Sequence, residues 1–372
     1  MTGVGQSITG WATGQSLQIK AGARITFYGL YGAYNFATEV GATFTIPTGS
    51  QFRCGLNAPT AFFVNAGTIT GGGQFRVWSI PALRNLWNNG TISITSFELY
   101  HAGNTATNIT YVLQTNLNMP TTSFLINSAA ATYTATVKAG SYTITCKGLT
   151  VSTRGILTAE TSIIKPADNW DSSAGTFNQN TSTVNMTGAS KTINTAAAGS
   201  FYDLNISGTI STITNSFTIA HSLTVTSTGT LSVGTGLSVD FTINGGTWTN
   251  RGTLNGAGTL YIDYSASDST ISFGRVNTAT MIRALVGAAA NRVCTLGANA
   301  PFGSTLTISS AHASNTMTLT HGSNYLLNVT GAVTLGTRGI MTQGTGTWQF
   351  NTSYTQKGAS SVFTKGGSLS LG

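Results

Sequence analysis

One phrase occurs twice in this chain, and the repetition limits what the chain can fold into. Residues 140–158 read GSYTITCKGLTVSTRGILT, and residues 322–342 read GSNYLLNVTGAVTLGTRGIMT. Both begin with Gly-Ser and a nearby tyrosine and continue with alternating apolar residues. Both end in Thr-Arg-Gly-Ile, an apolar residue and Thr, which places Arg154 and Arg338 at matching positions. Self-similarity of this kind is typical of stacked structural units.

Parts of the phrase recur elsewhere at uneven intervals. Its Leu-Thr or Val-Thr start appears at 149–158, 223–233, 306–310 and 333–342. Three copies are followed by Gly-Thr and an aromatic residue, namely Phe177, Trp248 and Trp348. A propeller or a leucine-rich array would be more regular. Short alternating segments, each closed by Gly, Asn or Ser, instead predict a β-solenoid or stacked β-sandwich-like repeats.

The composition supports an all-β fold. Thr is abundant and Gly contributes 45 residues, whereas Glu occurs only at positions 39, 98 and 160. Thr favours strands and Gly favours turns. Only 7% of the residues are charged, against a usual share of about 25%, yet 40% are hydrophobic, which argues against a disordered chain.

The texture of the sequence predicts two regions. Residues 1–115 are richer in aromatic residues and are interpreted as a β-rich N-terminal attachment or assembly domain. Residues 116–372 form the repetitive, strand-rich region, with internal repeats around 140–193, 201–264 and 281–363. Two stretches are also compatible with a helix. Pro81 and Asn89-Gly90 favour a short helical turn at 81–90, whereas 278–293 fits a helix but aligns better with strand repeats.

The repeats also predict individual positions. Leu149, Leu223 and Val333 should occupy equivalent inward places. The glycines that follow these strands, Gly155, Gly229 and Gly339, are expected to sit at corners that require a positive φ angle. The aromatic residues Phe177, Trp248 and Trp348 are interpreted as half-buried packing anchors at matching places.

Charge and cysteine content predict few ligands. The formal net charge is +8, but the cations are spread along the chain, so we expect no nucleic-acid partner. Cys54, Cys146 and Cys294 lie far apart and are odd in number, so buried free thiols are expected. The histidines show no metal-binding spacing. We therefore expect no metal site and no cofactor.

The N-terminal residues also limit the cellular context. Residues 1–20 lack the basic segment and apolar run of a secretory signal. The chain contains no apolar stretch of the ~18 residues that a membrane-spanning helix needs. We expect no membrane insertion. Either the chain leaves its cell inside a virus particle, or it is a fragment of a longer exported protein.

The strongest candidate for chemistry is ADNWD at 167–171. Asp168 and Asp171 flank Trp170, and glycoside hydrolysis uses two carboxylates beside a bound sugar. A turn rich in Asp and Asn with a partly buried tryptophan has the same letters, so Asp168 and Asp171 are weak catalytic candidates. A more distant carboxylate partner, such as Asp203 or Asp240, also remains open.

Glycan binding has three candidate residues. Trp170 could stack on a sugar ring. Arg154 and Arg338, repeated at one position of the phrase, could contact an anionic sugar. The alternative for both arginines is a solvated charge at the corner of a repeat.

The repetitive half of the chain resembles known surface proteins. The combination GTFNQNTSTVNMTGASKTI, FYDLNISGT and SLTVTSTGTLSV is similar in texture to β-solenoid segments of phage tail fibres and tailspikes and of bacterial surface adhesins. The resemblance covers about residues 177–372. It implies an extended β-rich fold, oligomerisation and surface attachment, and it carries no catalytic signature.

These observations predict a structural, non-enzymatic protein of a virus particle, located on the virion surface as a tail fibre, spike or decoration component. The first alternative is a subunit or fragment of a cell-surface appendage, surface layer or adhesin. The second alternative is a polysaccharide-degrading β-solenoid enzyme. The expected partners are further copies of the chain, as a homotrimer or repeating assembly, other virion or surface proteins, and cell-surface polysaccharide. The uncharged stretch 223–239 supports self-assembly, because exposed strand edges are normally protected by charges.

Overall fold

A computed structural model describes residues 16–22, 24–26, 30–33, 35–56, 61–79, 83–103, 107–197, 199–243, 245–358 and 360–371. It divides the chain into two compact units, Met1–Val184 and Asn185–Gly372. The boundary near residue 115 that the sequence texture indicates falls inside the first unit. The segment 1–15 lies outside the described residues.

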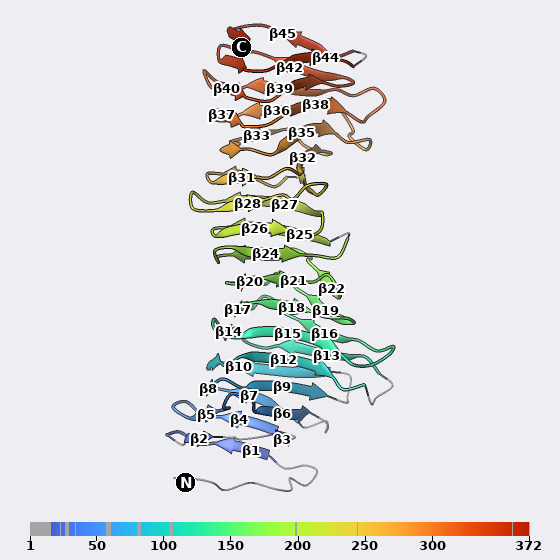
Figure 1. Cartoon of the computed structure of the whole chain (residues 1–372). Coiled ribbons are helices and arrows are strands. Elements are labelled where there is room, and N and C mark those ends of the chain that lie inside the picture. The colour runs from blue at the N-terminus through green and yellow to red at the C-terminus, as the bar shows by residue number, and fades with distance from the viewer. Residues whose placement is uncertain are drawn as a thin grey trace. The chain divides into compact units, whose positions relative to one another are not determined.

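Both units are parallel β-solenoids, with about 15 turns in total. Figure 1 shows the strands stacked coil upon coil within each unit. The described residues contain no helix, so none of them belongs to a helix that could cross a membrane. The prediction of an all-β solenoid is confirmed, and the sandwich alternative is not needed.

In the first unit the chain visits three faces in turn. One face follows the order β1-β4-β7-β10-β13-β16-β19-β22. Its strands are β1 (Ser16–Ile19), β4 (Asn35–Thr38), β7 (Phe63–Asn65), β10 (Leu83–Asn88), β13 (Ile109–Leu113), β16 (Ala135–Lys138), β19 (Gly155–Thr158) and β22 (Thr176–Asn178).

The second face consists of the four-stranded sheet β2-β5-β8-β11 and of a second run of paired strands in the order β14-β17-β20-β23. Their strands are β2 (Arg24–Thr26), β5 (Thr43–Thr45), β8 (Thr68–Thr70), β11 (Thr91–Ser93), β14 (Leu117–Met119), β17 (Thr143–Cys146), β20 (Ile163–Pro166) and β23 (Thr183–Met186).

The third face follows the order β3-β6-β9-β12-β15-β18-β21. Its strands are β3 (Leu30–Ala33), β6 (Gln51–Leu56), β9 (Gln74–Ser79), β12 (Ser96–His101), β15 (Ser123–Ser128), β18 (Leu149–Val151) and β21 (Trp170–Asp171).

The second unit begins with coils of two strands and then gains a third face. One face comprises β24 (Lys191–Asn194), β26 (Thr209–Ile213), β28 (Thr230–Ser232), β31 (Thr253–Asn255), β34 (Arg275–Val276), β37 (Ala300–Phe302), β40 (Leu326–Val329), β43 (Thr347–Phe350) and β46 (Ser368–Leu371).

The next face comprises β25 (Gly199–Ile206), β27 (Phe217–Val225), β29 (Ser238–Ile243), β32 (Thr259–Tyr264), β35 (Ala279–Ala284), β38 (Leu306–Ser310), β41 (Val333–Leu335) and β44 (Tyr354–Gln356), and β30 (Trp248–Asn250) also pairs with β27. The third face comprises β33 (Ser269–Ile271), β36 (Arg292–Leu296), β39 (Met317–His321), β42 (Gly339–Thr342) and β45 (Val362–Thr364).

The core consists of in-register columns of apolar side chains. Alternate residues of each strand point inward, so register partners on successive coils stack on one another. On the third face of the first unit, one column runs Phe52, Phe75, Phe97, Phe124, Leu149 and Trp170, each at most 1% exposed. Continuous burial of this kind stabilises the stack without charges.

The repeated phrase corresponds to one complete coil. In its first copy it forms β17, β18 and β19, and in its second copy β40, β41 and β42. Arg154 and Arg338 occupy the same corner, between the second and third strands, with φ angles of 57° and 51°. The prediction that the two phrases adopt the same local fold is confirmed. Leu149, Leu223 and Val333 are all buried and face inward, as predicted, but their places are not equivalent, because β18 belongs to a different sheet from β27 and β41.

The predicted role of the corner glycines is wrong in its mechanism. Gly155, Gly229 and Gly339 do not have a positive φ angle, and in two of the three corners the left-handed residue is the preceding arginine. A Cβ atom on these glycines would lie 2.4, 2.3 and 2.1 Å from a carbonyl oxygen of the preceding coil. Glycine is required because two backbones approach closely.

The aromatic residues after Gly-Thr do not occupy matching places as predicted, because their strands β22, β30 and β43 belong to three different sheets. Phe177, Trp248 and Trp348 each pair in register with a leucine of the preceding coil, namely Leu157, Leu223 and Leu327. The burial of Trp248 and Trp348 supports the packing-anchor interpretation for these two residues. Trp248 and Trp348 are buried more deeply than predicted, at 6% and 0% exposed, whereas Phe177 is partly exposed.

The two ambiguous stretches are strands. Residues 83–88 form β10, so the predicted helical turn at 81–90 is wrong there, and Pro81 lies outside the described residues. The alternating pattern of Leu86 and Asn88 inward and Asn85 outward fits a stacked coil better than a helix. Residues 279–284 and 292–296 form β35 and β36, which confirms the strand prediction for 278–293.

The three cysteines are free and buried, as predicted. Burial raises the pKa of the Cys146 and Cys294 thiols to about 12 and raises the pKa of Cys54 further. We expect the native chain to leave Ellman's reagent unreacted at pH 8, because thiolate is the reactive form. All three thiols should react after unfolding in guanidinium chloride. Rapid labelling of any thiol in the native chain would contradict this burial.

Candidate functional site

The structure places Trp170 inside the core. Trp170 is the last member of the column that contains the phenylalanines of the third face, and it is 0% exposed. Its Nε1 donates to Ser172 Oγ at 3.0 Å, and its rings lie 4.7 Å from the Phe177 ring between centroids. The indole therefore presents no face on which a sugar ring could stack.

The two carboxylates beside Trp170 cap local turns. Asp168 Oδ1 accepts from the backbone N of Asn169 at 2.9 Å. Asp171 Oδ1 accepts from the backbone N and the hydroxyl of Ser173, at 3.1 and 2.7 Å. Both aspartates are partly exposed. The contacts match those of an Asp-rich turn, so the arrangement favours that alternative over paired catalytic acids.

Arg154 and Arg338 tie successive coils together at their corners. Arg154 Nη1 donates to the carbonyl of Ala130 at 2.9 Å, and Arg338 Nη1 lies 3.4 Å from the carbonyl of His312. Each guanidinium also keeps donors exposed to solvent, because Arg154 is exposed and Arg338 is partly exposed. The positions fit corner charges, and glycan contact at either arginine stays a prediction.

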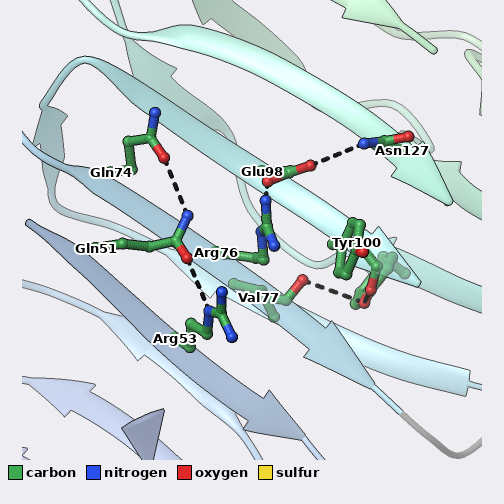
Figure 2. Close-up of polar contacts among 9 residues, drawn as sticks. Gln51, Arg53, Gln74, Arg76, Val77, Glu98, Tyr100 and Asn127 are labelled. Atoms are coloured by element: carbon green, nitrogen blue, oxygen red, sulfur yellow. Dashed lines mark hydrogen bonds and ion pairs between the residues drawn. The ribbon is translucent and has the colours of Figure 1, made fainter. Parts of the chain in front are cut away.

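A charged cluster that sequence reasoning missed lies on the outward third face of the first unit (Figure 2). Arg76 Nε donates to Glu98 Oε2 at 2.6 Å, and the guanidinium lies 4.2 Å from the centroid of the Tyr100 ring. Asn127 Nδ2 donates to Glu98 Oε1 at 3.2 Å. Arg76 and Glu98 are direct register partners on β9 and β12.

The Glu98 side chain is only 9% exposed, so both of its oxygens are engaged at a nearly dry position. On the preceding coils, Gln51 Nε2 donates to Gln74 Oε1 at 3.0 Å and Gln51 Oε1 accepts from Arg53 Nε at 2.7 Å. Polar side chains thus bond along the stacking direction, as the inward columns pack along it. This cluster holds neighbouring coils in register.

The second unit carries a related cluster on its face that contains β29, β32 and β35. Arg283 forms a bidentate ion pair with Asp263, whose side chain is 5% exposed, and the guanidinium lies 4.1 Å from the centroid of the Tyr261 ring. Asp240 Oδ2 lies 3.9 Å from Arg283 Nη2. Burial raises the pKa of the Asp263 carboxyl, and the hydrogen bonds from Arg283 act in the opposite direction.

Asp240 and Asp263 are a second pair of carboxylates to compare with the needs of glycoside hydrolysis. Both lie near Nη2 of Arg283, at 3.9 and 2.9 Å, so the two oxygens concerned are at most about 7 Å apart, and glycosidases place their carboxyl groups about 5–9.5 Å apart. Asp263, however, is buried and both of its oxygens bind the guanidinium. A carboxylate held this way cannot approach a glycosidic oxygen, so the pair favours a structural role.

A histidine lies at an irregularity of the strand pairing in the same unit. Between Phe201 and Asp203 the register of β25 and β27 shifts, and His221 Nδ1 lies 2.7 Å from Asp203 Oδ1. Ser222 Oγ lies 3.1 Å from the same nitrogen. A Ser-His-Asp triad needs the serine and the aspartate on opposite ring nitrogens, so these three residues do not form one.

Among the described residues, no group of three or more His, Cys, Asp or Glu side chains is placed to hold a metal ion. In the comparisons with known proteins, no family model, no curated protein and no solved structure matches this chain.

Proposed function

We propose that this chain is a structural, non-enzymatic protein of a virus particle, a component of a tail fibre, spike or surface decoration. Its role is to form a rigid β-rich oligomer that assembles on the particle and attaches it to a surface. The localisation, the partners and the lack of enzymatic activity are parts of this proposal.

The observation that carries the proposal is the chemistry of the outward columns. In the first unit Thr43, Thr68 and Thr91 stack in register, and in the second unit Thr307, Thr334 and Thr355 do the same. Such columns present short, uncharged side chains that need little desolvation or ordering when another protein covers them. They therefore suit permanent packing against further copies of the chain or other surface proteins.

The charged clusters support the same role. The Arg76–Glu98 and Arg283–Asp263 pairs are internal to the coils and engage both partners with one another. Because each charged group is paired with its partner on the neighbouring coil, these ion pairs stabilise the register between coils.

Two measurements test the proposal. Light scattering on the purified chain should give a mass that is a multiple of 38.5 kDa, three-fold for a trimeric fibre. A stable monomer at high concentration would contradict the assembly. Antibodies against the chain, viewed by electron microscopy on material from its natural source, should label virus particles. Labelling confined to cell envelopes would instead support the cell-surface alternative.

A further inference from the structure

The outward face of β34, β37 and β40 in the second unit contains a hollow with a volume of about 400 Å³. Seven residues border it, namely Arg275, Asn277, Pro301, Phe302, Gly303, Asn328 and Thr330. This volume is within the usual range of about 300–1,000 Å³ for small-molecule sites. None of these residues belongs to the charged clusters described above.

One residue beside the hollow, Gly303, contributes no side chain to its outward column. Where each of these strands ends, the residues that follow stack in the order Asn255, Asn277, Gly303, Thr330 and Asn351, set by the register of the buried residue before each. Gly303 has no side chain, so the column is interrupted between Asn277 and Thr330. A Cβ atom at Gly303 would lie 2.4 Å from Asn277 Oδ1.

The polar groups around the hollow have bonding capacity left. Asn277 Nδ2 donates to Asn255 Oδ1 at 3.0 Å, and Asn328 Oδ1 accepts from Asn351 Nδ2 at 3.1 Å. Within the described parts of the chain, Asn277 Oδ1 and Asn328 Nδ2 have no protein partner. The Arg275 side chain is exposed and makes no ion pair with a described residue.

The remaining wall is apolar. Pro301 is exposed and precedes the buried Phe302, and it lies in register with Asn328 on the next coil. An apolar proline ring beside a guanidinium, amides and a hydroxyl complements a pyranose, which has an apolar C–H face and polar edges. Guanidinium groups bind carboxylates in a bidentate manner. A phosphate alone would leave the apolar wall unused.

We propose that this hollow, the Gly303 notch, binds a carboxylate-bearing pyranose unit of an acidic polysaccharide. Arg275 binds the carboxylate, the sugar ring lies on Pro301, and Asn277, Asn328 and Thr330 bind hydroxyl groups. The inference rests on the proposed function, because it gives the attachment role a binding site.

The test is a titration of the ¹⁵N-labelled full chain followed by nuclear magnetic resonance. D-Glucuronate at millimolar concentrations should shift the amide signals of Asn277, Gly303 and Thr330 saturably. D-Glucose and inorganic phosphate should bind at least ten-fold more weakly. Arg275→Gln should weaken glucuronate binding ten-fold or more. Lys165→Gln, which removes one exposed cation from β20 in the first unit, is the matched control and should change nothing.

Absence of saturable shifts at these amides, equal binding of glucose or phosphate, or unchanged binding by Arg275→Gln would overturn the notch assignment. Gly303→Ala, which places a methyl group in the notch, is a second variant and should also lose binding while retaining the β-sheet circular dichroism spectrum. If the chain forms oligomers and antibodies against it label virus particles, but it does not bind glucuronate, only the notch assignment is overturned. If the chain binds glucuronate but antibodies against it label no virus particle, the proposed function is overturned and the binding site stands.

Discussion

Trp348→Ala should lower the free energy of unfolding by about 3–5 kcal/mol, as the loss of a large buried aromatic side chain does. Trp348 is 0% exposed, and its ring centroid lies 5.5 Å from that of Phe363 and 6.0 Å from that of Phe350. Its Nε1 also donates to His321 Nε2. The substitution removes packing on both neighbours and leaves the histidine nitrogen without its donor.

The measurement is guanidinium unfolding followed by circular dichroism. Phe177→Ala is the matched control, because Phe177 follows the same Gly-Thr but is partly exposed, and it should cost clearly less. The loss of stability in Trp348→Phe should lie between the losses in Trp348→Ala and Phe177→Ala. If Trp348→Ala unfolds at the same denaturant concentration as the parent chain, Trp348 is not a packing anchor.

Gly339→Ala should destabilise the second unit by about 3 kcal/mol or more, at the upper end of the cost of overpacking. The added Cβ atom would lie 2.1 Å from the carbonyl oxygen of Ile308 and 2.8 Å from its carbon. Both are backbone atoms held by pairing between coils, so the coils must separate locally. The same argument applies to Gly155 against Ile126.

Arg338→Gly, one residue earlier, should raise the free energy of unfolding or leave it unchanged. Arg338 has a φ angle of 51°, a left-handed conformation that costs a non-glycine residue about 1–2 kcal/mol. Glycine relieves this cost and loses only a long contact to the His312 carbonyl. Arg338→Ala keeps the strain and serves as the control. Equal losses for Gly339→Ala and Arg338→Gly would show that the corner is not built as described.

The repeated phrase allowed the fold to be predicted because each coil of a solenoid is specified by a short, contiguous stretch of sequence. The strands alternate with period two and both copies of the phrase carry the same Arg-Gly corner, so the sequence of 140–158 predicts one coil, and 322–342 predicts another like it. The same logic identified Leu149, Leu223 and Val333 as inward residues. What it did not give was the conformation of the Arg154–Gly155 pair, because positive φ and close backbone approach both select glycine.

The polar clusters could not be predicted by the same route. Arg76 and Glu98 are 22 residues apart, and Asp263 and Arg283 are 20 apart, so each pair meets only once the coil length is known. Coil lengths vary through the chain, and one extra residue moves a side chain to the opposite face. The burial of Trp170 was not predicted for a related reason. Its column partners Leu149 and Phe124 lie one and two coils earlier in the chain.

In-register stacking of successive coils is tested most directly by disulfide trapping on the outward threonine column of the second unit. Thr307 and Thr334 are direct partners on β38 and β41, whereas Thr355 lies one coil further along the same column. Neighbouring strands are about 4.8 Å apart, within the Cα separation of a disulfide, and two coils exceed it. The double variant Thr307→Cys and Thr334→Cys should therefore oxidise to one intrachain bond, identified by peptide mass spectrometry, while Thr307→Cys with Thr355→Cys should stay reduced. Efficient bonding of the second pair, or none of the first, would contradict the solenoid.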